Sequence, residues 1–315
     1  MAISGSQQQK GMTTSGSSRF SAATVAQVSA LGLIWGFTFL FIKVSVEGLS
    51  PLWLVSVRTL SGLVVLLVAL RLRRIELPQT RVMWLHIAFL AVPANVIPWG
   101  MVAWAQFGVT SAMTAVLYSL IPLMTLVIAA AISLEQFTGR KLIGLILASA
   151  GNAVAVGFDS SGAGSIGAVV AVLVACALLA AGAVYAKRYV TPRVPALPMA
   201  TIQLGIAFLV STPLALVADG PPEWDRLTPS VLAASLTLGA IGTGLAFLLY
   251  YLLIERVGAT NATMITYITP VIGIIAGGVF LDEPIEATLL AGGAGIILGI
   301  WVAQGGRRTA PTVPV

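Results

Sequence analysis

The sequence predicts an all-α integral membrane protein with ten transmembrane helices, arranged as two inverted five-helix repeats. Three observations predict this fold class: ten apolar stretches of membrane-spanning length, basic residues that gather in alternate connections, and an internal repeat at one constant spacing. Hydrophobic residues make up 58% of the 315 residues and charged residues only 9%, whereas soluble domains carry about 25% charged residues. This composition excludes an ordinary soluble domain.

Each apolar stretch is long enough to cross a bilayer, which takes roughly 20 mostly apolar residues in a helix. The predicted spans are 24–46, 52–71, 82–105, 110–133, 141–158, 165–186, 197–217, 230–254, 259–281 and 287–304. They divide into a first repeat at 24–158 and a second repeat at 165–305. Residues 1–23 are polar and lack an apolar core, so we expect a disordered cytoplasmic tail there and not a signal peptide. A second cytoplasmic tail is expected at 306–315.

The basic residues predict the orientation of these spans. If the N-terminus is cytoplasmic, fourteen of the seventeen Lys and Arg fall in cytoplasmic segments, and only Lys43, Arg58 and Arg226 do not. Since cytoplasmic loops are enriched in Lys and Arg, both termini are expected in the cytoplasm. The net charge of +6 is interpreted as this topology signal and not as a nucleic-acid surface, because the basic residues lie in short turns.

Five residues of the first half recur in the second half at the same spacing of 148 residues. The pairs are Pro122 and Pro270, Glu135 and Glu283, Gly144 and Gly292, Gly151 and Gly299, and Gly157 and Gly305. Each half holds five spans, an odd number, so the second half must enter the membrane in the opposite orientation. Inverted repeats of this kind recur in secondary transporters, with the substrate site near the midplane between the repeats.

The first two spans carry two embedded basic residues. Trp35, Phe39 and Lys43 are spaced by four residues and share one helix face, which we expect to line a path through the protein. Two roles are open for Lys43: its ammonium reaches the lipid headgroups, or it contacts a carboxylate at the cavity mouth. Three roles are open for Arg58: an ion pair with Glu47, hydrogen bonds to backbone carbonyls, or direct contact with the substrate.

The third span, residues 82–105, is expected to be irregular and to line the cavity. Pro93 and Pro98 each remove a backbone donor and obstruct the preceding turn. Backbone carbonyls freed at this depth are tolerated only against protein or a water-lined cavity. Asn95, Trp99 and Gln106 keep i, i+4, i+11 spacing close to one helix face, which we expect to line the cavity. Asn95 and Trp99 are the candidate substrate-binding residues on this face.

Three tyrosines and one histidine complete the set of candidate cavity residues. Tyr118 and Tyr267 are predicted to bind substrate, and Tyr251 is a candidate for gating, although tyrosines also belong to the interfacial aromatic belt. His86, the only histidine, is a candidate for gating or an ordinary polar residue at the interface. Its position at the cytoplasmic start of the third span favours the interfacial role.

Glycines and the one cysteine are interpreted as packing residues. The motifs Gly273-x-x-x-Gly277 and Gly295-x-x-x-Gly299 place small residues one helical turn apart, which lets helix backbones approach closely. In the eighth span, the counterpart of the third, glycines stand at 239, 242 and 244. Cys176 lies in an apolar span and is expected to be a small buried side chain.

Together these motifs resemble a known family. They are Trp35-Gly36-Phe37-Thr38 with Lys43, Arg58, the two patterns Pro122…Glu135 and Pro270…Glu283-Pro284, and the stripes Gly144…Gly151 and Gly292…Gly299. Over residues 24–305 the chain is similar to the drug/metabolite transporter superfamily, in its ten-helix branch with two EamA-type repeats. The resemblance implies an exporter of small metabolites in the bacterial inner membrane, and one branch of the family handles amino acids.

The expected function is therefore amino-acid export by alternating access between two five-helix halves. A sugar or nucleotide-sugar transporter is the alternative, because aromatic rings also stack on sugars, and a channel or an intramembrane enzyme is more remote. The sequence contains no zinc-protease motif, Walker loop or nucleophile elbow, and a single His and a single Cys make a metal site improbable. We expect no cofactor, no nucleic-acid partner, and a monomer in the lipid bilayer.

Overall fold

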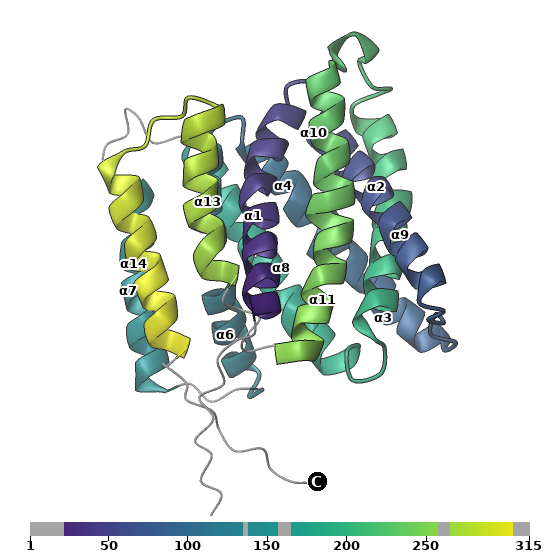
Figure 1. Cartoon of the computed structure of the whole chain (residues 1–315), viewed down its shortest axis with the longest axis horizontal. Coiled ribbons are helices and arrows are strands. Elements are labelled where there is room, and N and C mark those ends of the chain that lie inside the picture. The colour runs from purple at the N-terminus through teal and green to yellow at the C-terminus, as the bar shows by residue number, and fades with distance from the viewer. Residues whose placement is uncertain (1–21, 135–137, 157–164, 258–264, 305–315) are drawn as a thin grey trace, which may run out of the picture.

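The computed structural model describes residues 22–134, 138–156, 165–257 and 265–304, and the regular structure within these ranges is helical. The helices stand side by side in one bundle (Figure 1). The start of the first helix and the end of the last lie at the same end of this bundle. We call that end, at the bottom of Figure 1, the lower end, and the opposite end the upper end.

The helices of the first half precede the connection at 157–165, and those of the second half follow it. The first half comprises α1 (Ala22–Ser45), α2 (Pro51–Leu72), α3 (Arg81–Ala91), the π-helix η1 (Val92–Val96), α4 (Ile97–Ala105), α5 (Ser111–Tyr118), α6 (Ile121–Ala131) and α7 (Gly139–Val156). The second comprises α8 (Ile166–Tyr189), α9 (Ala196–Ala218), the short 3₁₀-helix η2 (Trp224–Arg226), α10 (Pro229–Gly239), the π-helix η3 (Ala240–Leu245), α11 (Ala246–Val257), α13 (Ile265–Phe280) and α14 (Ala287–Gln304).

Seven helical segments of the described chain are long and apolar enough to cross a membrane, which confirms the all-α integral membrane class. They cover the first four and the sixth to eighth predicted spans. The other three predicted spans correspond to α7, α13 and α14, with 18, 16 and 18 residues. Apolar stretches of α13 and α14 are shorter than a full span, so the count of ten membrane crossings stays a prediction.

Side-chain caps fix three helix starts at the upper end. The hydroxyls of Ser50, Thr110 and Thr228 accept hydrogen bonds from backbone amides two or three residues into α2, α5 and α10. Pro51 and Pro229 occupy the first helical position of α2 and α10, where no backbone donor is needed. These caps satisfy amides that have no partner inside the helix.

Both third helices contain a π-helical interruption at equivalent positions. The segments η1 and η3 begin at Val92 and Ala240, which are separated by the same 148 residues as the sequence repeat. In the first half, Pro93 and Pro98 lie at the starts of η1 and α4. The irregular helix predicted from these prolines is confirmed. In the second half, Gly239 and Gly244 bring η3 against α2. Such π-helical turns often mark functional sites.

The two halves interleave in space. Helix α1 packs against α13 and α10 of the second half, and α8 packs against α4 and α6 of the first half. Glycines allow the α1 contact, because a Cβ on Gly32 or Gly36 would lie 2.6 Å or less from the side chains of Ile268 or Ile272. The halves that the sequence divides are therefore not two separate bodies.

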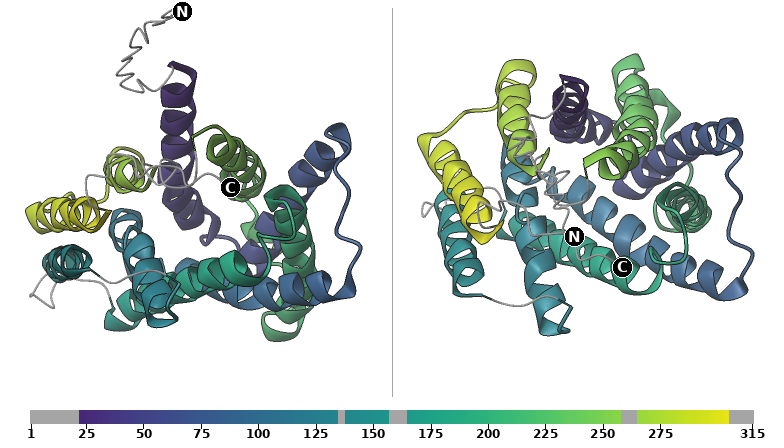
Figure 2. Two further views of the ribbon diagram at one scale, coloured as in Figure 1. Left: turned by 90° about the horizontal axis from the view of Figure 1, so that it is seen from below. Right: turned by 60° about the horizontal axis from the view of Figure 1, so that its bottom comes forward.

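At one edge of the bundle, α7 and α14 lie side by side (Figure 2). Their backbones meet at glycines: a Cβ on Gly144 would lie 2.5 Å from the Gly299 carbonyl oxygen, and one on Gly151 would lie 2.7 Å from that of Gly292. A Cβ on Gly295 would lie 3.0 Å from Gly151 Cα. The predicted packing role of Gly295 and Gly299 is confirmed, and the seam joins the last helices of both halves.

Charged residues are distributed unequally between the two ends of the bundle. Arginines and lysines flank the helix ends at the lower end, as in the turn after α2, the start of α7 and the end of α8. The upper turns carry mostly acidic residues, among them Glu47, Asp219, Glu223 and Asp282. The two ends of the bundle therefore differ in the sign of most of their charged residues.

The glycine seam generates a stability prediction. Replacement of Gly151 by Ala places a methyl group within 2.6 Å of the Ile296 backbone nitrogen, so α7 and α14 must separate. We expect a loss of about 1–3 kcal/mol, the usual cost of overpacking, measured as a lower midpoint of thermal unfolding in detergent. Gly100→Ala is the matched control, since a Cβ there meets nothing within 4 Å. Equal midpoints for the two variants would contradict the seam.

Candidate functional site

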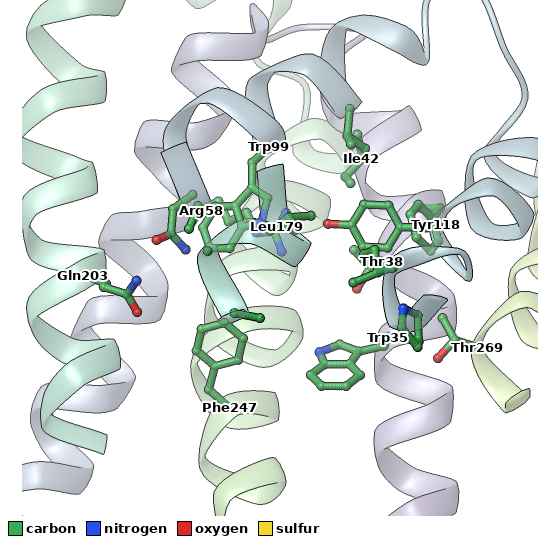
Figure 3. Close-up of a pocket in the computed structure, with 18 of the residues that line it drawn as sticks. Trp35, Thr38, Ile42, Arg58, Trp99, Tyr118, Leu179, Gln203, Phe247 and Thr269 are labelled. Atoms are coloured by element: carbon green, nitrogen blue, oxygen red, sulfur yellow. The ribbon is translucent and has the colours of Figure 1, made fainter. Parts of the chain in front are cut away.

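A cavity of about 390 Å³ lies in the middle and lower part of the bundle. Helices of both halves line it: α1, α2, η1, α4, α5 and α6 from the first, and α8, α9, α11 and α13 from the second (Figure 3). None of the described lining residues belongs to α7 or α14. The interleaved helices therefore form the cavity, and the glycine seam lies outside it.

Arg58 is the only charged side chain among the described residues that line this cavity. It reaches the cavity from α2 and is 9% exposed. Its Nε donates a 2.8 Å hydrogen bond to the hydroxyl of Thr243 in η3, and its guanidinium carbon lies 4.0 Å from the centre of the Trp99 ring. The arginine thus joins elements of both halves at the centre of the protein.

The Arg58 guanidinium has no carboxylate partner among the described residues. The ion pair with Glu47, one of the roles left open for Arg58, is not formed, and Glu47 is exposed at the turn after α1. Arg226 and Glu223 form an ion pair in the exposed turn between α9 and α10, and neither residue lines this cavity. A fixed cation in apolar surroundings attracts an anionic group much more strongly than the same cation in water. The cavity is therefore suited to a carboxylate.

Two side-chain amides add neutral hydrogen-bonding groups. Asn95, in η1, is 5% exposed, lines the cavity and has an Oδ1 atom without a hydrogen-bond partner in the described structure. Gln203 extends from α9 on the side of the cavity near Arg58 (Figure 3). A buried amide oxygen without a partner is unfavourable until a donor arrives, so Asn95 favours a ligand that donates hydrogen bonds.

Aromatic side chains form much of the remaining wall. The rings of Phe39 and Tyr118 meet edge to face with centroids 5.2 Å apart, and the Tyr118 hydroxyl points into the cavity (Figure 3). Trp35 lies lower on α1 and contacts Tyr250, with ring centroids 5.3 Å apart. Aromatic faces attract cations, particularly where water is excluded. The cavity thus offers one positive group for an anion and several ring faces for a cation or an apolar group.

The lining hydroxyl groups mostly serve their own helices. Thr38, Ser119 and Thr269 each donate to a backbone carbonyl three or four residues earlier. This is the usual behaviour of Ser and Thr inside helices. Their donors are occupied, so ligand recognition depends mainly on the guanidinium, the amides and the rings.

The structure brings six predicted substrate-binding residues into the cavity wall. They are Trp35, Phe39, Arg58, Asn95, Trp99 and Tyr118. The side chains of Tyr251 and Tyr267 lie outside the part of the chain that the structure describes. Pro93 and Pro98 shape the wall through η1 and α4 and are not themselves among the described lining residues.

Neither Lys43 nor Gln106 is among the described lining residues, and Ile42 lines the upper part of the cavity in place of Lys43. The Lys43 ammonium donates to the backbone carbonyls of Gln106, directly after α4, and of Val109, in the turn that follows. This contact differs from both roles expected for Lys43, because the side chain turns to a helix end and not to headgroups or cavity. A cation is favourable there because carbonyls at a helix C-terminus carry partial negative charge.

His86 also lies apart from the cavity. Its Nδ1 lies 2.6 Å from the Tyr185 hydroxyl, and its ring stacks on Tyr189 at a centroid distance of 5.6 Å. These residues connect α3 to α8 at the lower end, which agrees with an interfacial aromatic cluster.

Sequence reasoning missed most of the wall that the second half contributes, including Gln203 and Phe247. Gln203 lies on α9, where no cavity residue was predicted, and Phe247 lies on α11, where Tyr251 was the predicted candidate. A glutamine near the middle of an apolar span is a recognisable signal, because polar side chains in the hydrocarbon need a protein partner or water. Phe247 gives no such signal, since an apolar ring is equally suited to face lipid.

A turn at the upper end of the bundle is held between two charged side chains. The turn joins α4 to α5. Its backbone carbonyls at Gln106 and Val109 accept the hydrogen bonds from Lys43. On its amide side, the Glu283 carboxylate accepts hydrogen bonds of 2.7 and 3.0 Å from the amides of Ser111 and Ala112, and one of 2.9 Å from the Ser111 hydroxyl. We call this arrangement the upper clamp. An anion is favourable at the start of α5, as a cation is at the end of α4.

Comparison with known proteins agrees with this architecture. Residues 23–157 and 166–304 each match the EamA-like transporter family. The uncharacterized inner membrane transporter YedA of Escherichia coli (strain K12) is 27% identical over 91% of this chain and 92% of its own length. A probable amino-acid metabolite efflux pump of Salmonella typhimurium is 22% identical over 90% of this chain and 95% of its own.

A solved crystal structure of another protein, 20% identical, has the same fold with a TM-score of 0.66, covering 89% of this chain and 96% of that one. The two sequence matches span most of the chain, and each contains part of the cavity wall. The protein is therefore a membrane transporter of small molecules that belongs to the EamA-like transporter family.

Proposed function

We propose that the protein exports small amino acids across a bacterial inner membrane by alternating access. The observation that carries this proposal is Arg58, a cation held inside an otherwise uncharged cavity without a carboxylate partner among the described residues. A substrate carboxylate supplies the missing anion. The relative named as a probable amino-acid metabolite efflux pump supports the same substrate class.

The other end of an amino acid also has suitable partners. Its ammonium donates to the Asn95 Oδ1 atom and lies against the faces of Trp35 or Tyr118. An apolar side chain fits against the aromatic and aliphatic wall. The cavity of about 390 Å³ lies within the range of small-molecule sites, roughly 300–1,000 Å³, and suits a compact ligand.

A sugar or nucleotide sugar is the second candidate. The amides of Asn95 and Gln203 beside aromatic rings favour it, because sugar hydroxyls bond to amides and sugar faces stack on rings. The single cation favours the amino acid. Counterflow in liposomes with labelled amino acids, sugars and organic cations separates the classes, and exchange of sugars without amino acids would overturn the first proposal.

The cytoplasm is assigned to the lower end, where α1 starts and α14 ends, and the cavity then faces the cytoplasmic half of the membrane. This state has the upper clamp in place, as an exporter needs when it loads from the cytoplasm. Because α1 and α8 each pack within the opposite half, the bodies that move must contain helices of both halves. The cycle then consists of opening at the upper clamp and closing at the lower end.

The assigned orientation predicts which positions are reached from outside the cell. A Cys placed at Gly220, in the upper turn after α9, should react with a membrane-impermeant maleimide in intact spheroplasts. A Cys placed at Arg74, in the lower turn after α2, should react only after permeabilisation. Cys176 is buried and gives a low background. The opposite labelling pattern would reverse the orientation and the direction assigned to the cavity.

The proposed recognition of carboxylate predicts the effect of two cavity substitutions. Arg58→Met should raise the KM of an amino acid by about tenfold or more, the value of a charge-assisted hydrogen bond, and should spare the matching amine. Trp99→Ala should weaken binding by about 0.5–2 kcal/mol through loss of its ring. Trp104→Ala is the matched control, because Trp104 lies on the same helix and is 51% exposed. Equal losses for acid and amine in Arg58→Met would contradict the carboxylate assignment.

A third substitution tests whether transport depends on a carboxylate. The described cavity lining contains no acidic residue, and Glu283 serves as a helix cap. Glu283→Gln keeps an oxygen acceptor, so most of the counterflow should remain, whereas Glu283→Ala should cost about 0.5–2 kcal/mol of stability through loss of the cap. Glu286→Ala, at an exposed position nearby, should reduce neither counterflow nor stability. Abolished exchange in Glu283→Gln with intact substrate binding would identify Glu283 as a coupling group.

A further inference from the structure

The face of α1 that lines the cavity continues upward to a second cation. Phe39 and Ile42 line the cavity, and Lys43 follows one turn above Phe39. The Phe39–Tyr118 ring pair lies at this level, with centroids 5.2 Å apart. A ligand that leaves Arg58 for the upper end passes these rings and reaches the region of Lys43.

The side chain of Gln106 is in an unusual position beside this lysine. Its backbone carbonyl accepts the hydrogen bond from Lys43, so the two residues are in direct contact. The side chain is 0% exposed, and neither its Nε2 nor its Oε1 atom has a hydrogen-bond partner in the described structure. A buried amide with both groups unpartnered is unfavourable, and native proteins rarely keep one without a reason.

We propose that Lys43 and Gln106 form a second carboxylate-binding site, which the substrate occupies above the Phe39–Tyr118 pair after it leaves Arg58. The partners of Lys43 in the present structure are neutral carbonyls. A carboxylate displaces them, because hydrogen bonds between two charged groups are the stronger ones. The Gln106 amide then donates from Nε2 to the carboxylate and accepts at Oε1 from the substrate ammonium.

The upper clamp explains why this site is closed in the present structure. The α4–α5 turn carries Gln106 and is held by Lys43 on one side and by Glu283 on the other. Movement of this turn away from α1 opens the upper end and separates Lys43 from its carbonyl partners. The same movement exposes the Gln106 amide, so the site exists only in the state that releases substrate. The inference rests on the proposed alternating access and carboxylate recognition.

The test compares the two sides of the membrane. Right-side-out and inside-out vesicles give the KM for exchange at the upper and lower end separately, with one transported amino acid and its matching amine as probes. In Lys43→Met, which keeps the aliphatic stem, the upper KM of the amino acid should rise about tenfold or more. Its lower KM and both KM values of the amine should not change. Lys43→Arg should restore the upper KM, and Gln106→Leu should raise it by a smaller factor.

Arg226→Gln is the matched control, because Arg226 is an exposed cation at the same end and should leave all values unchanged. Equal changes for acid and amine in Lys43→Met, or equal changes on both sides, would reduce Lys43 to a clamp residue and overturn the proposal. An unchanged upper KM would overturn it as well. If Arg58→Met distinguishes acid from amine while Lys43→Met does not, only this inference fails. If neither substitution distinguishes the amino acid from the amine, the proposed function fails too.

Discussion

A guanidinium held within the bundle is the constraint on which the centre of this structure depends. Arg58 cannot be left without partners in apolar surroundings, and its partners come from interrupted helices. Thr243 belongs to the π-helix η3, and its hydroxyl donates to the Leu238 carbonyl five residues earlier, a longer reach than an α-helix gives. Trp99 follows the equivalent π-helix η1. Both interruptions therefore supply the surroundings of the one charge in the described cavity lining.

Close backbone contact is the second requirement of this arrangement. The helices of each half lie among those of the other, and such interleaving works only where backbones approach without side chains between them. Glycines supply these places on α1, on η3 and along the seam of α7 and α14. In a bilayer, where lipid tails are as apolar as leucine, this packing contributes more to helix association than burial of apolar surface does.

Sequence reasoning predicted the features that follow from local chemistry. Span length, the prolines of the third span and the paired glycines identified the helices, the irregular region and the packing seam. It also identified six wall residues, because an embedded Arg58 or Asn95 is conspicuous in apolar sequence. Helical periodicity placed Lys43 on the face of Trp35 and Phe39 and so predicted a cavity residue. It could not show that carbonyls of a neighbouring turn would bind the Lys43 ammonium. Interleaving of the halves was not predictable from one half at a time, because it depends on contacts between distant segments.

The bond between Arg58 and Thr243 also bears on how the chain is made. The two residues are separated by 185 positions, so the ribosome reaches Thr243 roughly 10–40 s after Arg58 at ordinary elongation rates. During that interval α1 and α2 have entered the membrane without the helices of the second half that later surround them. The nascent first half must keep the Arg58 side chain close to water or to the insertion machinery. The surroundings of Arg58 are thus completed only when the second half has been made. A fragment of the chain that ends before η3 lacks the Thr243 hydroxyl that binds the Arg58 guanidinium.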